Sequence, residues 1–279
     1  MGDAAVGDAA KGDSVLVIGC GNMGGAIVKG LIRGGMQPRS VVAYDLDGDR
    51  LSVLQGELGV FATTDLSLAL SRCNTAVLAL KPQVVKGFLP RLAELLSPSQ
   101  GDFLLVSVVA GLELSEIRDF LGTLPSLVRV MPNLPCAIGA GLSLVYAEEG
   151  TALDFVRGLF STFSMVIELK EEAEFHVMTS LCGSGPAYVF LFAEAMADAA
   201  LKMGVDRERS RLLASQLIFG SAKMLLESGQ HPAYLKDMVS SPGGTTISGL
   251  CEMERLGFRH AVVSAVESGA KRSASLLGS

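Results

Sequence analysis

Short apolar runs alternate with amphipathic stretches along the first 169 residues of the chain. Unbroken Val, Leu and Ile runs of this length are typical of strands buried on both faces of a mainly parallel sheet. Between the early runs, apolar residues recur at helical spacing over residues 23–33, 47–57 and 84–96. The alternation predicts a doubly wound α/β domain over residues 14–169. The expected strands read SVLVIG (14–19), SVVAYD (40–45), TAVLAL (75–80), FLLVSV (103–108), LVRVM (127–131), GLSLVYA (141–147) and MVIEL (165–169).

The pattern changes after Leu169, where strand-like runs nearly vanish and Ala, Leu, Met, Glu and Lys dominate. Gly204 and Gly229 mark the ends of two long helical stretches, and Asp206 is placed to cap the second. Residues 170–279 are therefore predicted to form an all-α domain. We expect it to be packed rather than tethered, because no Pro/Gly linker separates it from the first domain.

The predicted helices carry apolar residues on more than one face, as in AYVFLFAEAMADAALKMG (187–204). Either these faces are buried among the helices of one chain, or the domain packs against a second copy of itself. We favour the second interpretation, because so small a domain has few internal neighbours to cover that surface. The expected assembly is a homodimer, with a higher homo-oligomer left open.

Composition excludes several classes of partner. The 279-residue chain has a net charge of −6 and no basic cluster, which argues against nucleic acid. Its five cysteines lack CxxC spacing and its three histidines form no metal-ligand pair, so we expect no metal site. No apolar run reaches the ~18 residues of a membrane span. Residues 1–13 are predicted to be a disordered tail without secretion or mitochondrial signals, which favours a cytoplasmic protein.

The segment VLVIGCGNMGG (15–25) places three glycines in GxGxxG spacing, between the first strand and the first helix. Gly19 would make the tight turn, and Gly21 would let the backbone approach a pyrophosphate. Gly24 would let the helix pack closely on the strand. This context predicts a Rossmann-type dinucleotide site.

Other candidate residues end strands at the same edge of the sheet, where ligands of such folds bind. Asp45 ends the second expected strand, where a carboxylate binds the ribose hydroxyls of NAD and repels a 2′-phosphate. Alternatively, Asp45 only caps the next helix. Lys81 with Pro82, and Ala110 with Gly111, follow two further strands. Spacing alone favours a solvated surface role for Lys81.

The segment SSPGGTTISGL (240–250) sets two glycines and two threonines ahead of an apolar helix pattern. One interpretation is a capped helix start, because Ser and Thr side chains accept hydrogen bonds from the first amides of a helix. The other is an anion site, because amides at a helix start that are not covered by side chains bind carboxylates and phosphates.

Taken together, these segments resemble the pyrroline-5-carboxylate reductase family, from about Val15 to Lys271. The resemblance implies reduction of Δ1-pyrroline-5-carboxylate, a small cyclic imine, to L-proline with NADH or NADPH, the last step of proline biosynthesis. It also implies a Rossmann-type domain followed by an all-α dimerisation domain. The segments that carry it are, in order, IGCGNMG, ALKPQ, RVMPNLP, CGSGPAYVF and LKDMVSSPGGTTISGL.

The resemblance further implies which residues bind the ligands. Gly243, Gly244, Thr245 and Thr246 would bind the substrate carboxylate, and the Thr246 hydroxyl would lie near the imine nitrogen as an orienting residue. Because the helical domain carries this loop, the site is expected between domains or subunits. The expected cofactor residues are Gly19, Gly21, Asn22, Met23, Gly24, Asp45, Lys81, Pro82, Ala110 and Gly111.

Several residues depart from the family pattern. Leu66 stands where Asn commonly reaches the cofactor, and Leu134 stands where Thr is usual. His176 stands where Asp is usual, and Cys182 stands where Ser is usual. Gly229 stands where some members carry Glu. The first two departures put cofactor affinity in question.

Asp45 also departs from the pattern, since NADPH-preferring members usually carry Ser, Asn or Arg in this region. Asp45 therefore favours NADH as the cofactor. Arg50 lies close enough in the sequence to reach a 2′-phosphate, which leaves use of both cofactors open.

Alternative functions remain at this point. A reductase of a related six-membered cyclic imine would need the same carboxylate site. A non-catalytic dinucleotide sensor would fit the departures, but it would not need an intact SPGGTT. A β-hydroxyacid dehydrogenase is disfavoured, because CGSGPAYVF lacks the lysine which that family carries there.

Overall fold

The structure is a computed structural model and describes residues 14–96, 103–123, 125–148 and 152–275. The tail expected over residues 1–13 lies outside them. The chain forms two compact units. We call Met1–Ser184 together with Gly269–Ser279 the sheet unit, and Gly185–Ser268 the helical unit.

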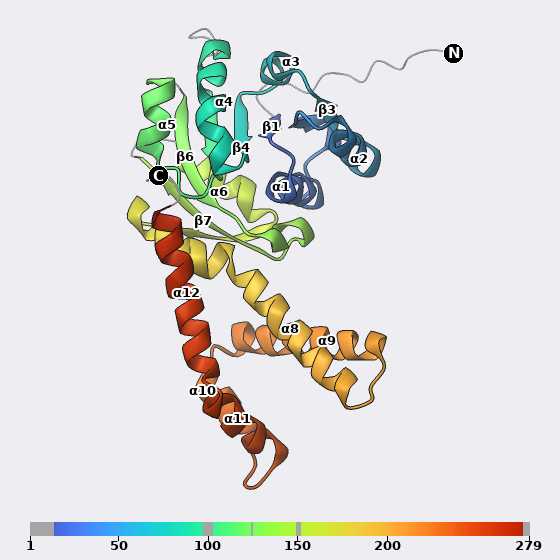
Figure 1. The fold of residues 1–279 in the computed structure, drawn as a ribbon. Coiled ribbons are helices and arrows are strands. Elements are labelled where there is room, and N and C mark those ends of the chain that lie inside the picture. Colours follow the sequence, from blue (N-terminus) through green and yellow to red (C-terminus); the bar gives the residue numbers. More distant parts are fainter. Residues whose placement is uncertain (1–13, 97–102, 124, 149–151, 276–279) are drawn as a thin grey trace, which may run out of the picture. The chain divides into compact units, whose positions relative to one another are not determined.

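An eight-stranded sheet forms the framework of the sheet unit (Figure 1). Its strands are β1 (Val15–Ile18), β2 (Val41–Tyr44), β3 (Phe61–Thr63), β4 (Thr75–Leu78), β5 (Leu104–Ser107), β6 (Ser126–Met131), β7 (Gly141–Ala147) and β8 (Ser164–Glu168). They lie in the order β3-β2-β1-β4-β5-β6-β7-β8. Pairing is parallel from β3 to β6, antiparallel between β6 and β7, and parallel between β7 and β8. The prediction of a mainly parallel sheet is confirmed, and the first six strands have the Rossmann order.

The hydrophobic pattern does not predict β3. This strand has three residues, each only partly buried, and it pairs with β2 at one edge of the sheet. A short edge strand is held by backbone pairing rather than by a buried apolar run, so its sequence carries little signal.

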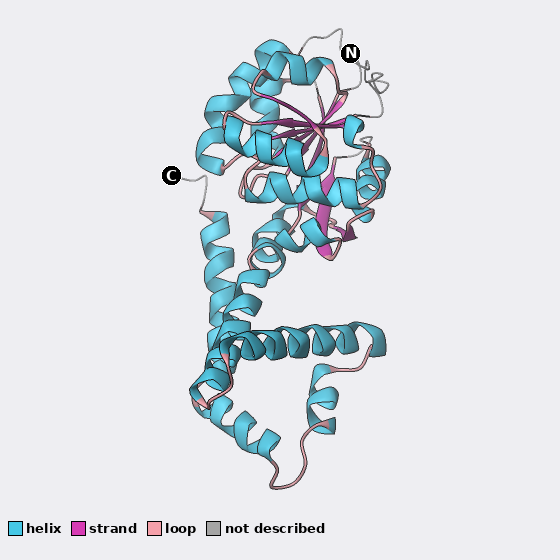
Figure 2. Ribbon diagram, turned by 90° about the vertical axis from the view of Figure 1, so that its right-hand side faces the viewer, coloured by secondary structure: helices cyan, strands magenta, loops and turns pink. Residues whose placement is uncertain are grey.

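Helices cover both faces of the sheet (Figure 2). Val15 and Val17 contribute to one core cluster, whereas Leu16 and Ile18 contribute to another. Successive strand residues point to opposite faces, so the two clusters lie on the two sides of the sheet. The doubly wound arrangement is thereby confirmed. The helices are α1 (Asn22–Arg33), α2 (Gly48–Leu58), α3 (Leu66–Ser71), α4 (Pro82–Leu95), α5 (Leu114–Leu121) and α6 (Leu153–Ser161).

The division between the units falls after Ser184, later than the predicted boundary after Leu169. The intervening segment includes α7 (Phe175–Met178) and a π-helical turn over Thr179–Gly183. Phe175 and Cys182 pack with residues of β6 and β7 in a third core cluster. This packing groups the segment with the sheet although its sequence is helical.

The helical unit contains no strand among its residues, all of which are described, and the all-α prediction is confirmed. Its helices are α8 (Gly185–Lys202), α9 (Arg207–Ser228), α10 (Pro232–Met238), α11 (Thr245–Arg255) and the larger part of α12 (Phe258–Ala274). The Asp206 side chain accepts a hydrogen bond from the Arg209 amide, which confirms it as the N-cap of α9. Gly229 ends α9 in a left-handed conformation.

Apolar side chains of the helical unit remain largely uncovered. Leu212, Phe219 and Leu226 recur every seven residues along α9, and they are 68%, 61% and 76% exposed. No residue of α10 or α11, both fully described, is buried. A single chain therefore leaves this unit without a complete core.

Candidate functional site

The glycine loop between β1 and α1 is held close to the neighbouring strand. Gly19 has a φ of +89°, and a Cβ at this position would lie 2.7 Å from Leu80 Cδ2. A Cβ on Gly24 would collide with the carbonyl oxygen of Gly19. These contacts explain why glycine occupies both positions. A side chain on Gly19 would push the turn away from Ala79 and Leu80, and one on Gly24 would push the helix away from the turn.

Gly21 lies in a different setting. A Cβ there would meet no heavy atom within 4 Å, and Gly21 is the N-cap of α1 without a side-chain hydrogen bond. The first amides of α1 therefore open onto free space. β1 stands between β2 and β4, where the strand order reverses, and this is the place at which dinucleotides bind in such sheets. The loop and the helix start thus fit the pyrophosphate of a dinucleotide.

Asp45 is tied to the glycine loop. Its Oδ2 accepts hydrogen bonds from the Cys20 amide at 2.7 Å and from Arg50 Nη1 at 3.1 Å, and its Oδ1 accepts one from the Asp47 amide at 3.0 Å. Partial burial by itself would raise the pKa of Asp45. The two amides and the Arg50 guanidinium outweigh burial, so the pKa is lowered from its ordinary value. The helix-cap alternative for Asp45 is wrong, because Asp47 caps α2 by accepting the Arg50 amide.

A cleft of about 550 Å³ lies at the carboxyl edge of the strands. Six of the sequence-predicted cofactor residues line it: Gly21, Asn22, Met23, Lys81, Pro82 and Ala110.

The other four predicted cofactor residues do not line the cleft. Gly19 and Gly24 shape the loop, and Asp45 is linked to the cleft through Arg50, which does line it. Gly111 is buried and makes a turn with a φ of +80°.

Sequence reasoning missed one wall of the cleft. Met131 ends β6 and Pro132 follows it, and Thr179 and Gly183 come from the π-helical turn. CGSGPAYVF drew attention to Gly183, but Thr179 was not among the predicted site residues, because by itself it looks like an ordinary helical residue. Asn133 fastens this wall: its Nδ2 donates to the Cys182 carbonyl at 3.2 Å.

The departures from the family pattern have distinct structural settings. Leu66 is completely buried in the core at the start of α3, so its side chain does not reach the cleft. Leu134 is 44% exposed and lines a neighbouring cavity of about 580 Å³, which shares Gly21, Asn22 and Arg50 with the cleft. Nδ1 of His176 is buried without a hydrogen-bond partner.

The segment SSPGGTTISGL forms a helix start without a side-chain cap. Gly243 has a φ of +68°, and Gly244 is the N-cap of α11 with no side-chain hydrogen bond. A Cβ on Gly244 would collide with the Ser241 hydroxyl. The expectation of a Ser or Thr cap is wrong, because Thr245 and Thr246 are already the first two residues of the helix. The first amides of α11 are therefore not covered by a capping side chain.

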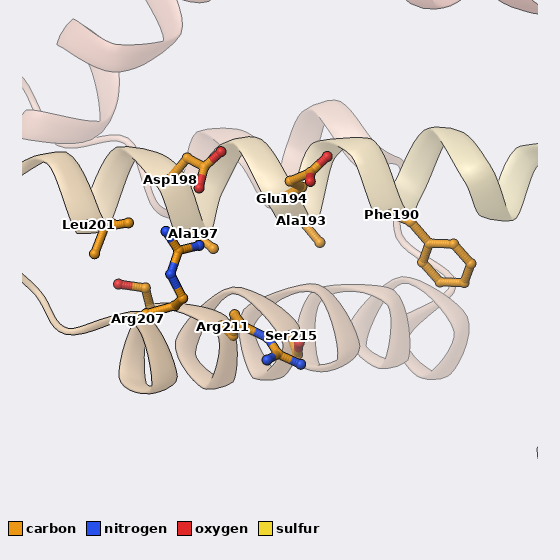
Figure 3. Close-up of a pocket in the computed structure, with 10 residues that line it drawn as sticks. Phe190, Ala193, Glu194, Ala197, Asp198, Leu201, Arg207, Arg211 and Ser215 are labelled. Atoms are coloured by element: carbon orange, nitrogen blue, oxygen red, sulfur yellow. The ribbon is translucent and has the colours of Figure 1, made fainter.

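A second groove, of about 420 Å³, lies between α8 and α9 in the helical unit (Figure 3). Glu194 and Asp198 on α8 and Arg207 and Arg211 on α9 line the groove, together with small and apolar side chains. Among the described residues, no helix is long and apolar enough to cross a membrane, and no group of three or more potential metal ligands is present.

The fold and the cleft define a nicotinamide-dinucleotide oxidoreductase. Residues 14–111 match the family described as NADP oxidoreductase, coenzyme F420-dependent. Residues 172–276 match the family described as pyrroline-5-carboxylate reductase dimerisation. The chain belongs to the pyrroline-5-carboxylate reductase family, as its relatives show.

The similarity covers nearly the whole chain. The chain is 38% identical over 265 residues to the pyrroline-5-carboxylate reductase of Escherichia coli strain K12, and the match covers 93% of this chain and 96% of the relative. The pyrroline-5-carboxylate reductase of Glycine max is 38% identical over 270 residues, and the match covers 93% of this chain and 94% of that relative. The structure of the Plasmodium falciparum pyrroline carboxylate reductase with NADP bound matches with a TM-score of 0.85 at 28% identity, covering 96% of this chain and 99% of that one.

Proposed function

We propose that this protein reduces the ring imine of Δ1-pyrroline-5-carboxylate to L-proline, the last step of proline biosynthesis. The observation that carries the proposal is the start of α11. Amides without a side-chain cap follow two glycines there, in a chain that also has a dinucleotide cleft. A small anionic substrate and a nucleotide cofactor account for both features.

The sheet unit would hold the cofactor, which supplies a hydride when bound. The amides at the start of α1 bind the pyrophosphate, and Gly21 leaves them room to do so. Lys81, Pro82 and Ala110 line the cleft beyond the glycine loop. The chain thereby orients the cofactor without needing a catalytic side chain in this unit.

The helical unit would hold the substrate. The first amides of α11, at Thr245 and Thr246, bind its carboxylate. Amides fix the anion without a fixed positive charge, which would disfavour a protonated imine nearby. The Thr246 hydroxyl hydrogen-bonds the imine nitrogen and orients the ring. Its contribution is to positioning rather than to acid catalysis, because the proton can arrive with the substrate or through water.

Asp45 would favour NADH over NADPH. A carboxylate accepts about four hydrogen bonds, so Asp45 keeps capacity for a ribose hydroxyl beyond its three observed partners. Its negative charge opposes a 2′-phosphate, although Arg50 offsets part of that charge and leaves some NADPH use. Asp45→Asn should raise kcat/KM for NADPH relative to NADH. If wild type has a kcat/KM for NADPH well above its kcat/KM for NADH, the preference is refuted.

The helical unit would form a homodimer. The exposed apolar stripe of α9 and the groove of Figure 3 leave surface that a second copy would cover. Sedimentation of the purified protein tests this directly, and a monomer at micromolar concentration would contradict it.

The first experiment follows the loss of nicotinamide absorbance with purified protein and pyrroline-5-carboxylate, run in parallel with NADH and NADPH. Turnover with either cofactor supports the reductase. The six-membered homologue of the substrate serves as the second arm. Turnover only with that ring would identify a related imine reductase, and cofactor binding without turnover of either ring would indicate a sensor.

A further inference from the structure

One polar atom at the cleft lacks a partner inside the protein. Thr179 Oγ1 is buried and makes no hydrogen bond. Among the described residues, four buried side-chain polar atoms have no hydrogen-bond partner. Of the four residues that carry these atoms, only Thr179 lines the cleft. Buried hydroxyls are nearly always paired in native proteins, so an unpaired one at a cleft marks a group that the ligand completes.

The local backbone leaves this hydroxyl free. Thr179 opens the π-helical turn, and its carbonyl accepts the Ser184 amide at 3.0 Å. Its methyl lies against Gly183, where an added Cβ would be 3.8 Å from Cγ2. A helical threonine commonly bonds the carbonyl four residues back, but Thr179 does not. Single π-turns of this kind occur frequently at functional sites.

The turn is fixed to the sheet. Arg129 on β6 donates from Nη1 to Glu172 Oε1 at 2.8 Å, and the same oxygen accepts the Leu114 amide at 2.9 Å. The Arg129 guanidinium also lies over the Phe175 ring, 4.4 Å from its centroid. These contacts hold the segment that leads into the turn, so the Thr179 hydroxyl is positioned before any ligand binds.

We infer that Thr179 is a positioning residue which hydrogen-bonds the carboxamide of the nicotinamide. The inference rests on the proposed function. If the adenosine ribose of the cofactor lies next to Asp45 and the pyrophosphate lies at the start of α1, the nicotinamide end lies toward β5 and β6. Ala110, Met131 and Thr179 line the cleft there. A threonine hydroxyl both donates and accepts, and the carboxamide offers a carbonyl and an amino group. This bond fixes the rotation of the ring, and hence the face from which hydride leaves.

Thr179→Val, which keeps the shape and removes the hydroxyl, tests the assignment. Calorimetry should show NADH binding weakened about tenfold, the usual effect of losing one hydrogen bond in a buried site. ADP-ribose, which lacks the nicotinamide, should bind Thr179→Val as it binds wild type. Thr179→Ser should restore NADH affinity. Without ligand, Thr179→Val should melt no lower than wild type, because no internal bond is lost.

Thr162→Val is the matched control, because its hydroxyl bonds the Leu159 carbonyl and does not line the cleft. Unchanged NADH affinity in Thr179→Val would overturn the inference. Equal weakening of NADH and ADP-ribose, or a lower melting temperature without ligand, would assign a structural role instead. If wild type binds NADH but reduces no imine, the proposed function fails while the comparison of NADH with ADP-ribose still decides the role of Thr179.

Discussion

The two units bury their residues to very different extents. Every residue of β1, β2, β4 and β5 in the sheet unit is buried. Along its 18 residues α8 buries only Ala197, and along its 22 residues α9 buries only Ser210 and Ala214. The sheet unit completes its core within one chain, whereas the helical unit does not.

This difference separates what each unit needs in order to work. A helix that is apolar on most of its surface is stable only when neighbours cover it. The cofactor cleft belongs to the self-sufficient unit, and the substrate loop belongs to the unit that we propose a second copy completes. Cofactor binding should therefore survive changes that abolish turnover. Four predictions test this comparison of the two units.

The largest effect is expected from Phe219→Asp on α9. A carboxylate in a subunit interface costs several kcal/mol, so the dimer should dissociate at micromolar concentration and turnover should fall about 100-fold or more. Binding of NADH should stay within about twofold, because the sheet unit keeps its own core. Phe155→Asp is the matched control, since Phe155 lies on α6 of the sheet unit and is 47% exposed. An intact, active Phe219→Asp dimer would contradict the comparison.

A second prediction concerns the internal support of the sheet unit. Glu172→Gln leaves the buried Arg129 guanidinium without its charged partner, which should lower the free energy of unfolding by about 2–3 kcal/mol. The lowered free energy of unfolding of Glu172→Gln should not depend on protein concentration, whereas the effect of Phe219→Asp should. Denaturant unfolding at several protein concentrations measures this free energy. Glu168→Gln is the control, because its pair with Arg157 is exposed and should contribute less than about 1 kcal/mol.

Thr246→Ala tests the assignment of the substrate to the helical unit. The loss of its hydrogen bond should lower kcat/KM for the imine about 10- to 100-fold, while the dissociation constant of NADH stays unchanged. Ser248→Ala, a hydroxyl deletion on the same helix, should have no effect. Unchanged turnover would remove Thr246 from the mechanism.

The smallest effect is expected from the charge of Asp45. Its pKa is lower in the folded protein than in the unfolded chain, where Asp titrates near a pH of about 3.9. The ionised carboxylate therefore stabilises the fold above that pH, and the contribution disappears as the pH falls through the lowered pKa. Asp45→Asn should cost at most about 1 kcal/mol near neutral pH, because its partner Arg50 is exposed and solvent screens the pair. The difference should vanish in strong acid.

Unfolding of wild type and Asp45→Asn across the acid range measures this effect. Asp154→Asn is the control, because Asp154 is largely exposed and its pair with Arg157 is on the surface. A gap between wild type and Asp45→Asn that persists in acid would assign the stability loss to something other than the Asp45 charge.

Much of the fold can be predicted from the sequence, because the requirements concerned are local. Buried strands need unbroken apolar runs, and these predict seven of the eight described strands. The glycine loop and the segment before α11 also stand out, since tight turns and open helix starts demand glycine at fixed spacings. The expectation of a Ser or Thr cap on α11 was wrong, because the sequence does not reveal whether a Ser or Thr near a helix start is the N-cap or the first residue of the helix.

The remainder depends on contacts between residues far apart in the chain. The sequence places Leu66 where a cofactor ligand is expected, but packing buries its side chain in the core. Thr179 resembles any helical residue, and only the π-turn and the Arg129–Glu172 pair place it at the cleft. The sequence alone determined the two-domain plan, the glycine loops and the family. Tertiary packing decided which side chains reach the cleft and which apolar faces stay uncovered, because both depend on how distant segments pack together.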